Sequence, residues 1–218
     1  MLRRFEMYGF RETTAPELVD ELARVLRRTS RFIPEVLHNA VGRNESEADV
    51  ELVWEQAYEG PEAYARYMCH PYHICMLDRY LLPECPECIT ASRPQSQLGL
   101  LGYEIDGAPF RRDHGIRRLV AMKAAPGVDD GTWRAFASAL THRPAHTPDL
   151  RVSIVAPNTM GLEWVPDGWT HLWEQAYDDE AAMRRALVDE QAVLDAGPIE
   201  SWVDVHYRLE TESPVDEQ

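Results

Sequence analysis

The sequence predicts an α+β fold in which two tandem ferredoxin-like (βαββαβ) domains pack sheet-to-sheet. The first observation is an internal repeat: VWEQAY at residues 53–58 returns as LWEQAY at 172–177, and LRRF at 2–5 resembles IRRL at 116–119. Two matches in the same order, each about half a chain apart, indicate a duplication. The second observation is that both halves show the same order of extended and helical patterns. A chain of 218 residues has room for two domains of about 100 residues each.

The first half supplies the six elements of one such unit. We expect strands at residues 3–10, 35–41, 50–58 and 98–105, and helices at 16–29 and from 61 onward. Thr13 or Thr14 can cap the first helix, and Pro16 suits its first turn. Gly42 is expected to end the second strand. In the third strand, the two-residue period places Trp54 on one face and Glu55 on the other.

The second half repeats this order, which gives each half the βαββαβ unit. We expect strands at residues 117–124, 151–156, 170–177 and 200–209, and helices at 130–140 and 179–194. The helices cover one face of each sheet, and the other face needs a second sheet to bury it. The predicted organisation is a first domain at 1–105, a linker at 106–115, a second domain at 116–209 and an acidic tail at 210–218.

Composition narrows the classes of function. There are 22 Lys and Arg residues against 37 Asp and Glu residues, a formal charge of −15. This acidity argues against binding to nucleic acid, which needs a basic surface, and against anionic membranes. No apolar run reaches the roughly 20 residues of a membrane span, and the N-terminus does not resemble a signal peptide. We therefore expect a cytoplasmic protein whose partner is a small molecule. The two halves would form a pseudo-dimer inside one chain, and this chain would be either a monomer or part of a higher homo-oligomer.

The second helix of the first half carries the motif YMCHPYH at residues 67–73. A Tyr followed by His-Pro-x-His, after a strand that ends in an aromatic residue, resembles the stress-responsive dimeric α/β-barrel (Dabb) family. The segment FRE at 10–12 also fits that family. The resemblance implies ferredoxin-like protomers that pair sheet-to-sheet into a barrel, so this chain would form an intramolecular dimeric α/β barrel.

The same resemblance implies candidate catalytic residues. Some family members are polyketide cyclases that use a Tyr and a His of this helix for an aldol or Claisen-type ring closure. The matching positions are Tyr67 and His73. A His can take a proton near neutral pH, and a Tyr hydroxyl can stabilise the negative charge that develops on a carbonyl oxygen. The candidate substrate-binding residues around them are Arg4, Tyr58, Tyr64 and His70.

Arg4 is a departure from the cyclases, which carry a His at this position of strand one. A guanidinium cannot act as a base, although it can hold a carboxylate. In the second half, the positions of Tyr67 and His73 hold Ala186 and Ala192. The predicted site therefore lies in the first half, with the second half as its structural partner. The alternative is that the two halves drifted apart and neither is active.

All four cysteines lie between Cys69 and Cys88. Cys85-Pro-Glu-Cys88 is a zinc half-site, and Cys75 or Cys69 with a neighbouring His could complete it. The alternatives are a reversible Cys85–Cys88 disulfide and a plain loop within the insertion at 82–97. His70 next to Pro71 has a structural alternative, in which the pair shapes a helix break.

The leading hypothesis is a small-molecule enzyme of secondary metabolism, a cofactor-independent cyclase or lyase that acts on a carbonyl substrate in a cavity of the first domain. One alternative is a non-catalytic binding or stress-response protein on the same scaffold. A second is a haem-binding barrel with His70 or His73 as the iron ligand. Trp54 and Trp173 are expected to pack in the core or between the sheets.

Overall fold

The computed structural model describes residues 1–91, 99–107, 115–143, 147, 149–160 and 168–210. The first half contains β1 (Leu2–Tyr8), α1 (Pro16–Arg27), α2 (Thr29–Phe32), β2 (His38–Asn44), β3 (Leu52–Tyr58), α3 (Pro61–Met68), a π-helix (His73–Leu77), α4 (Asp78–Leu81) and β4 (Leu100–Glu104). The second half contains β5 (Ile116–Ala124), α5 (Asp130–Thr141), β6 (Leu150–Pro157), β7 (His171–Tyr177), α6 (Glu180–Asp195) and β8 (Ile199–Glu210).

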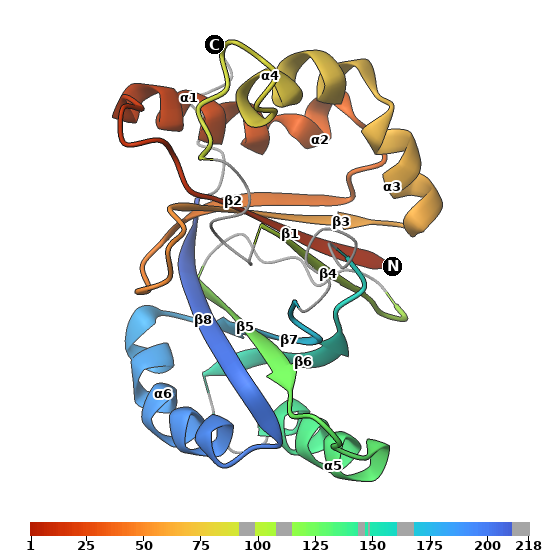
Figure 1. Cartoon of the computed structure of the whole chain (residues 1–218), viewed down its shortest axis with the longest axis vertical. Coiled ribbons are helices and arrows are strands. Elements are labelled where there is room, and N and C mark those ends of the chain that lie inside the picture. Colours follow the sequence, from red (N-terminus) through yellow and green to blue (C-terminus); the bar gives the residue numbers. More distant parts are fainter. Residues whose placement is uncertain (92–98, 108–114, 144–146, 148, 161–167, 211–218) are drawn as a thin grey trace.

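The strands form one antiparallel sheet in the order β4-β1-β3-β2-β8-β5-β7-β6. The sheet folds over on itself, so that β1–β4 face β5–β8, with α1–α4 outside one layer and α5 and α6 outside the other (Figure 1). At the two ends of the sheet, the Gly102 N–H donates to Asn158 (3.0 Å) and the Thr159 N–H donates to the Gly102 carbonyl (2.8 Å). These contacts draw β4 towards β6 and close the sheet into a barrel, as the sequence predicts.

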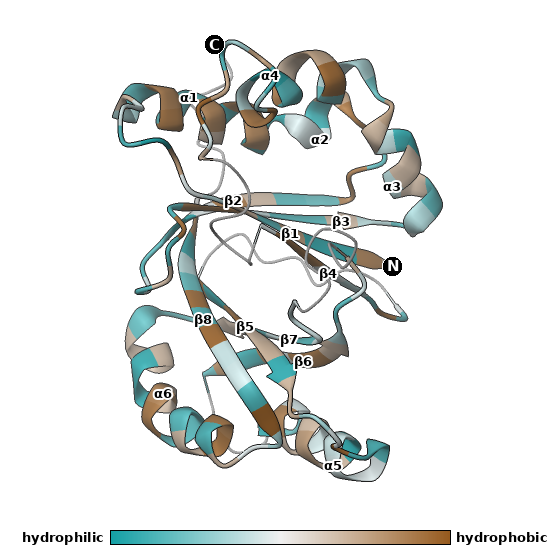
Figure 2. Cartoon of the chain, in the orientation of Figure 1, coloured by the Kyte–Doolittle hydropathy of each residue, from teal (hydrophilic) through white to brown (hydrophobic). Residues whose placement is uncertain are grey.

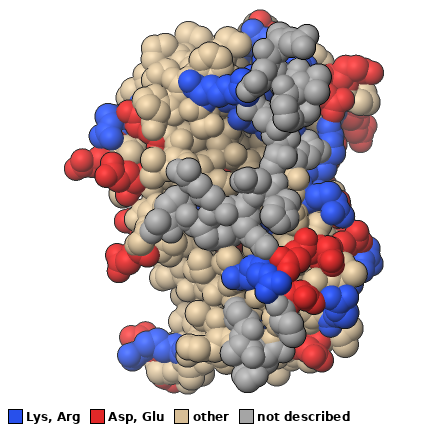
Figure 3. All heavy atoms as spheres, turned by 180° about the vertical axis from the view of Figure 1, so that it is seen from behind, with Lys and Arg blue, Asp and Glu red and all other residues tan. Residues whose placement is uncertain are grey.

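The strands keep the two-residue period expected of half-buried sheets. In β1, Leu2 and Tyr8 pack under the helices of the first half, whereas Phe5 and Met7 pack between the layers. Figure 2 shows hydrophobic and hydrophilic residues alternating along β8. On the face seen in Figure 3, acidic and basic side chains are intermingled over the surface. None of the helices among the described residues is long and apolar enough to cross a membrane.

A buried ion network lies between the two layers. Glu174 on β7 accepts hydrogen bonds from the Arg3 guanidinium on β1 (2.5 Å) and from the Tyr103 hydroxyl on β4. All three side chains are at most 1% exposed. Because a buried charge is tolerated only when it is paired, these contacts fix the two layers against each other.

The corresponding carboxylate of the first half is Glu55 on β3. It accepts hydrogen bonds from Arg117 on β5 (3.4 Å) and from the Tyr207 hydroxyl on β8 (2.9 Å). One contact has no counterpart: His38 Nε2 lies 2.6 Å from Glu55, whereas Val152 occupies the matching register position beside β7. The network is therefore nearly two-fold symmetric, with His38 as its asymmetric member.

Two predictions about local structure are wrong. Gly42 does not end a strand: it lies within β2, opposite Leu209, where an added Cβ would lie 2.5 Å from the Arg208 carbonyl oxygen. The cap of α1 is Ala15, without a side-chain hydrogen bond, because the Thr14 hydroxyl instead donates to Ile89 (3.1 Å).

The two repeated tryptophans are core residues, but they do not lie between the sheets. Trp54 and Trp173 each face the helices of their own half, in separate hydrophobic clusters. The inter-sheet positions belong to their neighbours Glu55 and Glu174. The alternation in the sequence predicts this division of faces, but not which face each sheet presents to the other.

Candidate active site

A π-helix places His73 inside the first half. α3 ends at Met68, and the chain turns at His70, whose Nδ1 accepts the Tyr72 N–H (3.1 Å). The predicted helix break is therefore present, with His70 as its structural element. The π-helix that follows begins at His73, which is 5% exposed. Single π-turns are rare and concentrate at functional sites, because the extra residue re-aims the side chains of the helix.

The structure brings Tyr67 and His73 together. Their rings meet edge-to-face with centroids 4.5 Å apart. The Tyr58 ring lies 5.2 Å from Tyr67, and Tyr64 stacks on Tyr67 at 5.9 Å. Four of the six predicted site residues therefore form one aromatic cluster between α3, the π-helix and β3.

Arg4 on β1 is the fifth member of the cluster. Its guanidinium lies over the rings of Tyr64 (5.4 Å) and Tyr67 (5.7 Å), where cation–π attraction holds it. It also donates hydrogen bonds to Gln56 and to the carboxylate of Glu6. Sequence reasoning missed Glu6, although the two-residue period of β1 puts it on the same face as Arg4. An incoming carboxylate would meet a guanidinium that is already paired.

The cluster contains polar atoms that are buried without a hydrogen-bond partner among the described residues. They are Arg4 Nε, Gln56 Nε2, His73 Nδ1 and the hydroxyls of Tyr8, Tyr58 and Tyr67. Leaving one such group unsatisfied costs about 1–3 kcal/mol, so a native fold rarely retains several. A set of this size in one place indicates a site that water or a ligand completes.

The environment sets the protonation of the two central groups. Burial lowers the pKa of His73 below 6.5, and the nearby Arg4 lowers it further. The Asp78 carboxylate, 3.8 Å from His73 Nδ1, raises this pKa but does not reverse the shift. The imidazole is therefore neutral at neutral pH. Burial raises the pKa of Tyr67 far above 10 although Arg4 opposes the shift, so its hydroxyl stays protonated. A neutral His can accept a proton, and a protonated Tyr can donate a hydrogen bond.

In the second half, the matching strand residues are hydrogen-bonded to a carboxylate from the helix above them. Arg118 donates to Gln175 (2.7 Å) and to Glu190 (2.5 Å), and the Tyr177 hydroxyl donates to Glu190 (3.1 Å). Gln175 donates in turn to Tyr177 (2.7 Å) and Glu190 (2.9 Å). Glu190 comes from α6, where Ala186 makes room under the helix. Every buried polar atom of this set has a partner.

The four cysteines do not converge. Cys69 and Cys75 are exposed, Cys85 is half-buried, and the Cys88 thiol lies buried against the Thr90 hydroxyl (3.4 Å). Among the described residues, no group of three or more His, Cys, Asp or Glu side chains is placed to hold a metal ion. Burial and neighbouring carboxylates raise the pKa of the Cys85 thiol, which disfavours the reactive thiolate.

A haem at His73 does not fit the observed packing. His73 lies against Tyr67, and Leu77 of the same π-helix is fully buried in the same hydrophobic cluster. An axial ligand needs a flat macrocycle beside its ring. A haem beside His73 would therefore require Tyr67 and Leu77 to move, so the proposal below uses no haem.

Residues 2–91 match the family model of the stress-responsive A/B barrel domain, Dabb. A search of curated proteins finds no match. Solved structures resemble the chain over nearly its whole length. A protein described as a monooxygenase from Fusobacterium nucleatum is 7% identical and covers 97% of this chain and 94% of its own (TM-score 0.64).

Two further solved structures show the same likeness. An anthrone oxidase-like protein is 13% identical, covering 96% of this chain and 91% of its own (TM-score 0.58). A mutant chlorite dismutase from Candidatus Nitrospira defluvii is 10% identical, covering 99% and 92% (TM-score 0.58). At these identities the likeness establishes the fold, and the chemistry has to be argued from the residues.

Proposed function

From the stress-responsive A/B barrel domain formed by residues 2–91, we propose a small-molecule enzyme that removes a proton from a carbon activated by a carbonyl group. The reaction would take place between α3, the π-helix and the sheet of the first half. The observation that carries the proposal is the set of buried polar atoms without partners around Arg4, Tyr67 and His73. In the second half, the matching residues Arg118, Gln175 and Tyr177 are all hydrogen-bonded to Glu190 or to one another.

His73 is the proposed base and Tyr67 the proposed hydrogen-bond donor. The neutral imidazole takes the proton, the electron pair of the C–H bond moves to the carbonyl oxygen, and the Tyr67 hydroxyl stabilises the resulting enolate. Arg4, itself paired with Glu6, lies over the Tyr67 ring and holds that ring in place. No cofactor is needed for this step, because the atoms and electrons balance between substrate and imidazole.

The enolate can then follow two routes. It can close onto a second carbonyl group of the same molecule, as a cyclase requires. Alternatively it can react with O₂, so that a CH₂ group becomes a carbonyl and one water is released. The second route is the type of reaction that the descriptions of two solved neighbours name, anthrone oxidase-like and monooxygenase, so the test below includes it. Both routes begin with the same proton transfer, which is the step we assign to His73.

Access to the site requires side-chain movement. His73 is 5% exposed and Tyr67 is fully buried, whereas Tyr64 is half-buried at the rim of the same cluster. The tight packing also supports the second candidate, a protein that binds a carbonyl compound without turnover. The two candidates differ in whether bound ligand exchanges its acidic protons.

The test is exchange of the acidic protons of an anthrone with deuterium in D₂O, followed by NMR, with O₂ uptake measured in parallel. We expect His73→Gln to slow enzyme-dependent exchange by about 100-fold or more, and Tyr67→Phe by a smaller factor. His142→Gln, on the exposed end of α5, is the matched control and should leave exchange unchanged. The rate should be level at neutral pH and fall at acid pH, through a pKa below 6.5.

Exchange that persists unchanged in His73→Gln would remove His73 from the mechanism. Anthrone that raises the melting temperature of the protein without any exchange would favour the non-catalytic binding protein. Exchange without O₂ uptake would direct the search towards ring-closing substrates.

A further inference from the structure

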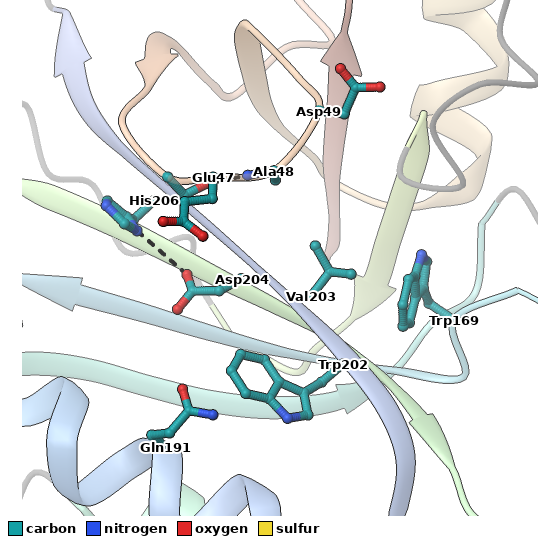
Figure 4. A pocket seen from close by; sticks show the side chains of 10 residues that line it. Glu47, Ala48, Asp49, Trp169, Gln191, Trp202, Val203, Asp204 and His206 are labelled. Atoms are coloured by element: carbon teal, nitrogen blue, oxygen red, sulfur yellow. Dashed lines mark hydrogen bonds and ion pairs between the residues drawn. The ribbon is translucent and has the colours of Figure 1, made fainter.

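A pocket of about 610 Å³ lies apart from the Tyr67–His73 cluster. It is hollowed between the β2–β3 turn, β8 and α6 (Figure 4). Its principal side chains are Glu47, Asp49, Trp169, Trp202, Asp204 and His206, and we call it the β8 pocket. The volume lies in the range of small-molecule sites, about 300–1,000 Å³. None of the proposed catalytic residues lines it.

The pocket exists because β2 leaves β8 early. β2 pairs only with the last four residues of β8, from Asn44↔Tyr207 to Val41↔Glu210. The last link is the Glu45 N–H, which donates to the His206 carbonyl (2.8 Å). Along the rest of that edge, no described strand lies beside β8, and the β2–β3 turn stands away from it. Strand edges of this kind offer backbone groups to a ligand.

The base of the pocket is electrically balanced. Asp204 accepts a hydrogen bond from Arg118 (2.7 Å), and Arg118 also pairs with Glu190 (2.5 Å). Glu190 pairs in addition with Arg143 (3.2 Å). Two guanidinium groups therefore face two carboxylates, so this layer neither attracts nor repels a charged ligand strongly.

The wall above that base is acidic. Glu47 and Asp49 of the β2–β3 turn are exposed and line the opening. No Lys or Arg is among the described residues that line the pocket. The two carboxylates thus leave the opening with surplus negative charge, which raises the local concentration of cations.

Aromatic side chains and unsatisfied polar atoms complete the pocket. Trp169 and Trp202 line it, presenting indole surface to the cavity. Trp169 Nε1, Asp204 Oδ1 and His206 Nδ1 are buried and have no hydrogen-bond partner within the part of the chain that the structure describes. His206 Nδ1 lies 3.5 Å from Asp204 Oδ1, without the geometry of a hydrogen bond. The Asp204 carboxylate as acceptor, an acidic rim and indole faces are the elements that recognise organic ammonium ions, whereas the Trp169 N–H can only donate.

We propose that the β8 pocket binds a small organic amine in its protonated form. The ammonium group lies between the carboxylates of Glu47 and Asp204, of which Asp204 also faces His206 (3.5 Å), and Asp49 adds negative charge to the rim. The apolar body lies against Trp202 and Trp169. This site is independent of the proton-transfer site, so a ligand here acts as a second substrate, an effector or a cargo molecule.

The test compares three soluble probes of one shape: phenethylamine (cation), 2-phenylethanol (neutral) and phenylacetate (anion). Binding is followed by quenching of tryptophan fluorescence at low salt, up to about 10 mM probe, because ligands of this size bind in the millimolar range. We expect phenethylamine to bind at least about fivefold more tightly than phenylethanol, and phenylacetate most weakly.

Two variants probe the recognition directly. The double variant Glu47→Gln/Asp49→Asn removes only exposed charges and should weaken phenethylamine about fivefold, bringing it close to phenylethanol. Trp202→Phe keeps an aromatic face and should weaken it less than Trp202→Ala. Glu200→Gln, on the same strand but paired with Lys123 outside the pocket, is the control and should change nothing. Four outcomes would overturn the proposal. Phenylacetate could bind more tightly than phenethylamine, all three probes could bind equally, phenethylamine could fail to bind, or its affinity could stay unchanged in the double variant.

Discussion

The two helix–sheet layers of this protein start from the same strand residues and end in opposite states. Arg4 with Gln56 in the first layer corresponds in register to Arg118 with Gln175 in the second. In the second layer, the Glu190 carboxylate accepts hydrogen bonds from both Arg118 and Gln175, so the residues between the helix and the sheet are paired. In the first layer, helix residues supply aromatic rings and an imidazole, and several polar atoms stay unsatisfied. The comparison teaches that one layer is built for stability and the other keeps polar groups for a ligand.

The largest expected effect is on the second layer. Glu190→Ala removes a buried acceptor shared by Arg118, Gln175 and Tyr177, and Arg118 keeps only Asp204 as a charged partner, so the free energy of unfolding should fall by about 3–5 kcal/mol. Urea unfolding measures the loss. Asp189→Ala, its exposed neighbour on α6, is the control and should be nearly neutral. A loss below about 1 kcal/mol would mean that Glu190 does not stabilise this layer.

The second effect concerns the centre of the barrel. Glu55→Gln leaves Arg117 and His38 beside an uncharged amide and should cost about 3 kcal/mol at neutral pH. Burial raises the pKa of Glu55, but Arg117 and Arg3 more than reverse this and hold it well below 4.5. A carboxylate with a lowered folded-state pKa contributes stability above its unfolded pKa and loses it as pH falls.

The difference between wild type and Glu55→Gln should therefore shrink as pH falls below about 4.5, the unfolded-state value. Unfolding curves at a series of pH values follow this directly. A difference that stays constant down to pH 3 would show that the charge of Glu55 is not what stabilises the barrel.

The third effect is the most direct test of the two layers. Tyr177→Phe removes a hydroxyl that donates to Glu190 and accepts from Gln175, so we expect a loss of about 1–3 kcal/mol. Tyr58→Phe, at the matching position, removes a hydroxyl that is buried without a partner, so stability should be unchanged or slightly higher. Equal losses in urea unfolding would contradict the difference between the layers.

The sequence predicts much of this architecture because strand periodicity and the repeat are local signals. The faces of β3, with Trp54 on one side and Glu55 on the other, follow from alternation alone. Tyr67 and His73 come from one short motif, and the structure places them in contact. In the second half, Ala186 stands at the position of Tyr67, and this difference in the sequence predicts that the second layer lacks the aromatic cluster.

The rest depends on contacts that no local pattern encodes. Glu174 meets Arg3 from 171 positions away, and Glu190 meets Arg118 from 72 positions away. Pro71 signals a break in the helix, but not that a π-turn beginning at His73 follows it. The β8 pocket arises from the early separation of two strands, which depends on register and not on residue type.

The smallest effect concerns how the helices of the two halves begin. α6 starts at Asp179, whose carboxylate accepts the Ala182 N–H (2.7 Å), whereas α3 starts at Gly60 with no side-chain cap. Gly60 has an extended backbone (φ 175°), and an added Cβ would meet no atom within 4 Å. Gly60→Asp should therefore stabilise the protein by about 0.5–1 kcal/mol, partly by capping and partly by restricting the unfolded chain. Gly60→Ala separates the two causes, because it restricts the chain without a cap. If aspartate stabilises no more than alanine in urea unfolding, the missing cap is not what distinguishes α3 from α6.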